Sequence, residues 1–283
     1  MALIRFVPVR LAPVLLALLL AGCGGSSDCP KVVVLTGYWP NTNEMLRRWS
    51  TDPAQNPQGW AGADWGGYGY DVHAFFPEFP PDGDPMNDPF GSDGWVGAPA
   101  SDLKVDFQDT SADFWRIMDT LQPHILITTS RGGEIGWEVE ALEGGHFGGT
   151  DDPAEDWAGD RHGAETLPTR TSIDHRSWEA ISTYRDGRRL PSRLPMDAIV
   201  AATEALGLVD VAIDHTGTSG NYLSGFMGLH GLYFNQITPH NVAAGHIHVG
   251  VDVTIADAER LMTATLAAVL ARFDARDLTC PES

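Results

Sequence analysis

The chain has 283 residues, with 38 acidic against 18 basic side chains and a formal net charge of −20 at pH 7. This excess of acids argues against nucleic acid or an anionic membrane surface as the main partner, because phosphates would be repelled. About 255 residues follow the N-terminal segment, which is enough for one large domain with a substantial core.

The N-terminus has the pattern of an export signal. Two arginines, Arg5 and Arg10, form a basic region before an apolar run over residues 11–21, which is too short to cross a bilayer because about 20 apolar residues are needed. The run is followed by Gly-Cys, and Leu-Ala-Gly-Cys resembles a bacterial lipobox. We therefore expect residues 1–22 to be a signal peptide, Cys23 to be acylated, and residues 23–30 to form a flexible tether. The protein would then be exported and anchored at the bacterial cell envelope, on the periplasmic side or the cell surface. The alternative is an ordinary cleaved signal with a chance cysteine.

The other two cysteines lie at the two ends of the remaining chain. Cys29 stands just before the first predicted strand, and Cys280 is close to the C-terminus. In an oxidising compartment such a pair is a candidate for a disulfide. Neither lies in a setting suited to catalysis, so a thiol enzyme is not expected.

Alternating strand and helix patterns follow along the chain. Short apolar or β-branched runs predict strands at 31–36, 70–76, 124–129, 209–214 and 246–251. Helical spacing of apolar residues predicts helices over 111–121, 194–206, 224–234 and 254–273, the last with a capping-box variant at its start. This alternation predicts one three-layer α/β/α sandwich over residues 31–283, built on a largely parallel, twisted sheet.

Two long segments interrupt this pattern. Residues 38–101 and 141–193 are rich in glycine, proline and aspartate, and we expect both to be irregular loop insertions, the first around the strand predicted at 70–76. The tryptophans of the first segment either line a pocket or fasten the loop to the body of the domain; they are Trp39, Trp60, Trp65 and Trp95.

Several segments resemble motifs of the pyroglutamyl peptidase I family. The run from Leu194 to Leu232 resembles the family segment that contains AGxYxCN, and it places Ser224 where the family has its nucleophilic cysteine. Residues 245–249 (GHIHV) resemble GFIHVP, which places His248 on the catalytic histidine.

Two upstream segments extend the resemblance. Residues 131–140 resemble GQAGGRxxIxxE and place Glu140 on the catalytic acid, and residues 35–40 (LTGYWP) are similar to LVTGFxPFG. The resemblance implies the fold of that family, no cofactor and no metal. It also implies substrate contacts at Tyr38, Trp39, Ser130, Arg131 and Leu223.

This chain departs from the family where the pyroglutamyl ring is bound. Ser130, Arg131 and Glu134 stand where the family has glutamine, alanine and arginine, and residues 38–41 (YWPN) replace an aromatic-Pro-Phe-Gly turn. These changes concern ring recognition more than the fold.

The three carried-over residues form a coherent catalytic set. A serine hydroxyl is a weak nucleophile until an adjacent base takes its proton, and imidazole titrates near neutral pH. Ser224 is therefore expected to be the nucleophile and His248 the general base, with Glu140 orienting the imidazole. Unpaired N–H groups at a helix start could stabilise the oxyanion.

Each residue also has a structural interpretation. The alternative for Ser224 is a small or capping residue, for His248 a core histidine, and for Glu140 one acid in a run of several. His246 and His248, with Asp214 or His215, suggest a metal site, but no further ligand spacing supports it.

The leading hypothesis is a serine-dependent hydrolase of peptides or small amides, held at the envelope through its lipid. One alternative is a catalytically inactive binding lipoprotein on the same fold. The other is a true pyroglutamyl exopeptidase that releases N-terminal pyroglutamate.

Overall fold

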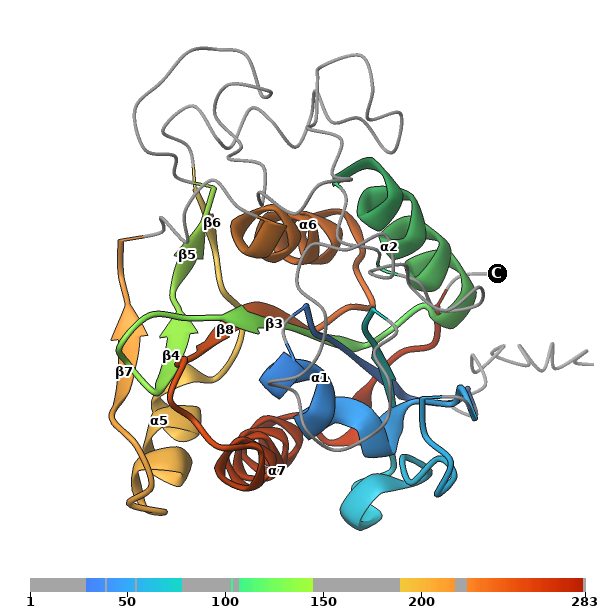
Figure 1. Cartoon of the computed structure of the whole chain (residues 1–283). Helices are drawn as coiled ribbons and strands as arrows, with labels where there is room; N and C mark the ends of the chain where they lie inside the picture. Colours follow the sequence, from blue (N-terminus) through green and yellow to red (C-terminus); the bar gives the residue numbers. More distant parts are fainter. Residues whose placement is uncertain are drawn as a thin grey trace, which may run out of the picture.

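A six-stranded sheet with the strand order β2-β1-β3-β8-β4-β7 forms the centre of the structure (Figure 1). The structure is a computed structural model that describes residues 29–38, 40–53, 55–77, 103, 107–144, 189–216 and 223–281. The strands of this sheet are β1 (Val32–Thr36), β2 (Asp71–Phe75), β3 (Ile125–Arg131), β4 (Trp137–Glu140), β7 (Val211–Asp214) and β8 (Ala243–Val249). Neighbouring strands are parallel, except that β4 runs antiparallel to β8.

Helices cover both faces of the sheet. Figure 1 shows α1 (Pro40–Leu46), α5 (Met196–Glu204) and α7 (Ile255–Arg272) on one face, with α2 (Phe107–Leu121) and α6 (Leu223–Ile237) on the other. A short antiparallel pair, β5 (Leu142–Glu143) and β6 (Leu190–Pro191), lies beside α6. This arrangement confirms the predicted single-domain, three-layer α/β/α sandwich.

The strand sequences explain why both faces are covered. All five residues of β1 are buried, and they alternate between the two sides of the sheet. Val33 and Leu35 belong to the core shared with α1, α5 and α7, whereas Val32 and Val34 belong to the core shared with α2 and α6. A strand buried on both faces reads as a continuous apolar run, as the sequence VVVLT does.

Several short elements differ from the sequence prediction, among them β5 and β6, which lie in the segment 141–193 that we expected to be irregular. Helix α1 lies in the segment 38–101 that we expected to be irregular, and its Met45 and Leu46 are fully buried. Strand β4 was not predicted; Trp137 and Val139 point into one core while the two acids between and after them face the other side. Seven-residue helices and strands of four residues depend on tertiary packing, which local patterns do not report.

The tryptophans of the first predicted insertion act as packing groups where they are described. Trp60 stacks on His73 and donates a hydrogen bond to the carbonyl of Val72, while Trp65 packs edge-on against Trp49. These contacts fasten the segment to β2 and the core. Trp39 and Trp95, and all of residues 145–188 in the second insertion, lie outside the described residues.

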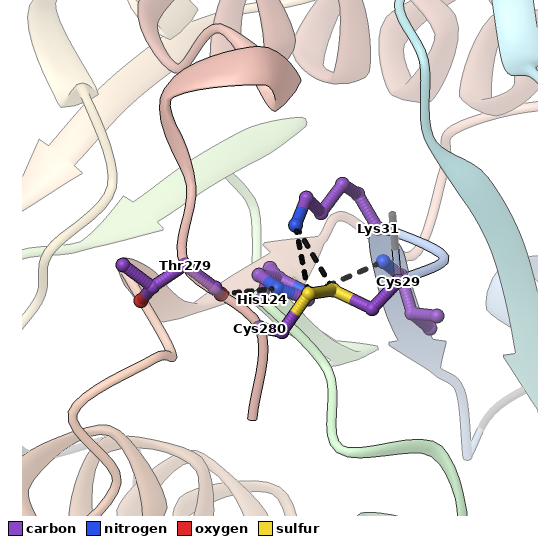
Figure 2. Close-up of a disulfide and its surroundings, with 6 residues drawn as sticks. Cys29, Lys31, His124, Thr279 and Cys280 are labelled. Carbon is purple, nitrogen blue, oxygen red and sulfur yellow. Dashed lines mark hydrogen bonds between the residues drawn. A yellow bond between two sulfur atoms is a disulfide. The ribbon is translucent and has the colours of Figure 1, made fainter. Parts of the chain in front are cut away.

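The two ends of the described domain are joined. Cys29 and Cys280 form a disulfide with a Cα–Cα distance of 5.7 Å, across a sequence separation of 251 residues. Figure 2 shows the buried Lys31 beside this bond, where its Nζ lies 3.0 Å from Sγ of Cys29. Within the described residues, no helix combines the length and apolar character that crossing a bilayer requires. The expected lipidation residue, Cys23, lies outside the described part of the chain.

Candidate active site

A buried hydrogen bond joins two of the three residues expected to be catalytic. Nδ1 of His248 lies 2.6 Å from Oε1 of Glu140, and the two side chains come from adjacent antiparallel strands, β8 and β4. Their relative exposures are 6% and 1%. A carboxylate that accepts from Nδ1 fixes the tautomer and ring orientation of the imidazole, which leaves Nε2 as the nitrogen able to accept a proton.

Two further acids flank this pair. The strand register places Glu138 opposite His248, and Asp214 at the end of β7 opposite Glu140. Burial raises the pKa of Glu140 above its usual range; the His248 hydrogen bond lowers it, and the charges of Asp214 and Glu138 raise it. Burial also raises the pKa of Glu138.

Asp214 behaves in the opposite way. Burial by itself would raise its pKa, but hydrogen bonds from the hydroxyl and backbone N–H of Thr216 lower it, so the net shift is downward. Along β8, β4 and β7 the pKa values of neighbouring carboxyl groups are therefore shifted in opposite directions, upward for Glu138 and Glu140 and downward for Asp214. Shifted pKa values of this kind are common at functional sites.

Ser224 stands in the first turn of α6, the helix that packs on β3 and β8. Its side chain is half-buried, and the neighbouring Leu223 is buried in the core shared by α2 and α6. The first N–H groups of a helix have no partner within it, so this turn can offer donors to an anion.

His246 occupies a closed environment beside His248. Its Nδ1 lies 2.7 Å from Oγ1 of Thr128, and its Nε2 lies 2.8 Å from Oγ of Ser130. Its ring packs edge-on against the ring of His248, with the ring centroids 4.7 Å apart. Burial lowers the pKa of His246 well below the usual value, and the nearby charge of His248 lowers it further. His246 is thus a neutral core histidine, and its nitrogens are already used by the two hydroxyl groups.

The residues expected to contact substrate have different environments. The hydroxyl of Ser130 is bonded to His246, and Tyr38 is buried with its hydroxyl 2.6 Å from that of Thr110 on α2. Burial raises the pKa of Tyr38 well above its usual value. Arg131 is exposed at the end of β3, and Trp39 lies outside the described residues. The structure therefore gives Tyr38 and Ser130 internal partners.

Sequence reasoning missed Glu138, and it considered Asp214 as a strand end near the site or as one possible ligand of a metal. The signal for Glu138 is its spacing of two from Glu140, which puts both carboxylates on one face if the segment is a strand. Glu138, Glu140 and His248 each offer one ligand atom, and these atoms lie within 4.8 Å of one another. The metal set considered from sequence had instead included His246.

Comparison with known proteins supports the fold. No family model and no curated protein matches the sequence. Among solved structures, pyroglutamyl peptidase I from Bacillus amyloliquefaciens matches with a TM-score of 0.53 and 13% identity, over 86% of this chain and 96% of that one. Pyrrolidone carboxyl peptidase from Thermococcus litoralis matches with a TM-score of 0.52 and 13% identity, over 85% and 94%. A variant of pyrrolidone carboxyl peptidase from Pyrococcus furiosus matches with a TM-score of 0.53 and 11% identity, over 85% of this chain and 99% of that one. Such low identity shows a shared fold, so the chemistry must be argued from this chain's own residues.

Proposed function

We propose that this protein is a hydrolase of amide or peptide bonds that uses Ser224 as nucleophile, His248 as general base and Glu140 as the orienting acid. The observation that carries the proposal is the buried 2.6 Å hydrogen bond between His248 and Glu140. Removing both groups from water is costly unless they are paired, and the pair leaves one imidazole nitrogen to act on a hydroxyl.

In this mechanism His248 takes the proton of the Ser224 hydroxyl as its oxygen attacks the substrate carbonyl. The same imidazolium then gives its proton to the leaving amine, and water hydrolyses the acyl-enzyme through the same base. Glu140 stabilises the imidazolium that forms in each half-reaction. Backbone N–H groups in the first turn of α6 would stabilise the oxyanion, each worth roughly 10²–10³ in rate in studied enzymes.

The matching structures are peptidases by name, which favours a peptide or small amide as substrate. We do not assign pyroglutamyl specificity, because Tyr38 and Ser130 are hydrogen-bonded inside this domain rather than left for a ligand. The substrate is therefore expected to be an acyl group other than the pyroglutamyl ring.

Labelling with a fluorophosphonate tests the nucleophile directly. We expect the mature protein to be labelled at Ser224, as located by peptide mass spectrometry, and labelling to disappear in Ser224→Ala and His248→Ala. Labelling at another residue would show that Ser224 is not the nucleophile. No labelling in a folded protein would contradict the proposal and favour a binding lipoprotein.

We further propose that the domain is displayed at the cell envelope by acylation of Cys23. The short apolar run that ends in Leu-Ala-Gly-Cys supports this location. Intact-mass analysis of the membrane fraction should find a chain that begins at Cys23 and carries added acyl mass. A soluble product cut elsewhere would refute the anchor.

A further inference from the structure

Three carboxyl groups meet His248 at one edge of the sheet, and the proposed hydrolysis uses only one of them. Glu138 and Glu140 lie two residues apart on β4 and face the same side, where Glu138 is opposite His248. Asp214 lies opposite Glu140 on β7. Each of the three carboxyls interacts with His248 and with at least one of the other two carboxyls.

One carboxylate oxygen in this cluster lacks a donor. Oε1 of Glu140 accepts from His248, but none of the described residues donates to Oε2, which is buried in a side chain only 1% exposed. Asp214 lies within hydrogen-bonding reach of Glu140, and its own oxygens accept from Thr216. Two ionised carboxylates cannot donate to each other, so this oxygen is satisfied by a proton, a cation or a donor outside the described residues.

We propose that Glu138, Glu140 and His248 form a binding site for a divalent transition-metal ion of the Zn²⁺ type. Their ligand atoms lie within 4.8 Å of one another, so small side-chain movements would bring them around one ion. One imidazole nitrogen with carboxylate oxygens is a donor set that Zn²⁺ accepts, whereas Ca²⁺ and Mg²⁺ prefer oxygen alone. A doubly charged ion would also offset the like charges collected at this edge.

Metal binding at this site would switch off the proposed hydrolysis, and this part of the inference rests on the proposed function. An ion that Glu140 also holds would bind Nδ1 of His248, because this is the ring nitrogen that faces the Glu140 carboxylate. The ring proton then lies on Nε2, which cannot accept the serine proton. The histidine thereby loses its role as base.

Calorimetric titration of the mature protein with Zn²⁺, after treatment with EDTA, tests the site without any assay of activity. We expect one equivalent to bind in wild type, and binding to weaken by at least about tenfold in Glu138→Gln, since a lost ligand should cost no less than a lost supporting contact. Glu134→Gln is the matched control, because it removes one exposed acid from the same segment. Mg²⁺ should give no comparable signal. If no Zn²⁺ binds, or if folded Glu138→Gln and wild type bind it with equal affinity, the proposed metal site is wrong. A proton shared between Glu140 and Asp214 would then account for the buried oxygen of Glu140.

Fluorophosphonate labelling with and without Zn²⁺ tests the inhibition. We expect one equivalent of Zn²⁺ to suppress labelling of Ser224 at least tenfold, with recovery on adding EDTA and a smaller effect in Glu138→Gln than in Glu134→Gln. Zn²⁺ binding with unchanged labelling would overturn the inhibitory role. Zn²⁺ binding in a protein that is never labelled would support the metal site and contradict the proposed hydrolase.

Discussion

At the scale of single residues, Glu140 offers the clearest separation of catalysis from stability. We expect Glu140→Gln to lower hydrolysis by on the order of 10²–10⁴-fold, because the amide cannot stabilise the imidazolium. Burial raises the pKa of Glu140, so its charge is disfavoured in the folded protein, and a neutral amide should leave the free energy of unfolding unchanged or higher at pH 7. Initial rates on an ester reporter and urea unfolding measure the two effects.

The same experiment distinguishes this role from a structural one. Glu134→Gln should match wild type in both measurements, since Glu134 is exposed. If Glu140→Gln instead lost stability and kept its activity, Glu140 would be a packing residue and the orienting role would be wrong.

Replacing the serine by cysteine tests both activation and specificity. In Ser224→Cys the thiol should react with iodoacetamide at pH 7 faster than in Ser224→Cys/His248→Ala, because a neighbouring base raises the thiolate fraction. A pyroglutamyl amide reporter should remain intact, since Tyr38 and Ser130 have internal partners. Cleavage of that reporter would instead show that the pyroglutamyl pocket is retained.

The sequence predicted that Glu140 and His248 act together because each lies in a short segment that resembles a family motif, and the structure joins the two by a hydrogen bond. The sequence did not single out Glu138, because an acid within a run of several acids is ordinarily a solvated side chain. Only the pairing of β4 with β8 shows that Glu138 faces His248. Nor does spacing show that Ser130 and Thr128 occupy both nitrogens of His246, since these contacts join residues 116 and 118 positions apart.

At the scale of elements, long apolar strands and amphipathic helices were predictable, and short elements were not. The predicted strands at 31–36 and 124–129 correspond to β1 and β3, and the helix predicted over 254–273 corresponds to α7 with Thr254 as its N-cap. These elements carry their own periodicity. The antiparallel direction of β4 arises from its tertiary contacts with β8, which leave no local signal in the sequence.

The contact between β4 and the end of β8 can be tested at Gly250. A Cβ at this position would lie 2.6 Å from the carbonyl oxygen of Ile135 and 2.8 Å from Cα of Gly136, both backbone atoms. We expect Gly250→Ala to cost about 1–3 kcal/mol of unfolding free energy, because the two strands must move apart. Hydrolysis should fall with it, since these strands hold His248 and Glu140. Gly133→Ala is the control, because a Cβ there meets nothing within 4 Å. Equal stability of the two variants in urea would show that this contact does not constrain the strands.

At the scale of the whole molecule, His124 ties the first strand to the C-terminal segment. Its Nδ1 accepts from the backbone N–H of Val32, and its Nε2 donates to the carbonyl of Thr279 (Figure 2 shows the second contact). Burial lowers the pKa of His124 to about 4, the bond to Thr279 opposes this, and the charge of Lys31 adds to it. In the unfolded chain His124 becomes protonated near pH 6.5, whereas in the folded protein it becomes protonated only near pH 4.

His124 therefore contributes stability that is present above pH 6.5 and is lost as the pH falls towards 4. We expect the urea midpoint of wild type to fall over this range. His124→Gln keeps a donor for Thr279 but cannot titrate, so it should be less stable than wild type at pH 7.5 and the difference should narrow at pH 5. A difference that is constant with pH would contradict a depressed pKa for His124.

The disulfide acts on the whole molecule because it closes nearly the entire described chain. A bond between residues separated by 251 positions restricts the unfolded ensemble far more than the folded one, where the two Cα atoms are already 5.7 Å apart. We expect Cys29→Ser/Cys280→Ser to lose about 2–4 kcal/mol of unfolding free energy in urea. In the absence of denaturant the double variant should still be labelled by fluorophosphonate. The disulfide joins the two ends of the described chain, whereas Ser224 lies in the first turn of α6. Thiol titration of denatured, unreduced wild type is the control. If both Cys29 and Cys280 react as free thiols in protein matured at the envelope, the disulfide does not form there. The double variant should then match wild type in its unfolding free energy.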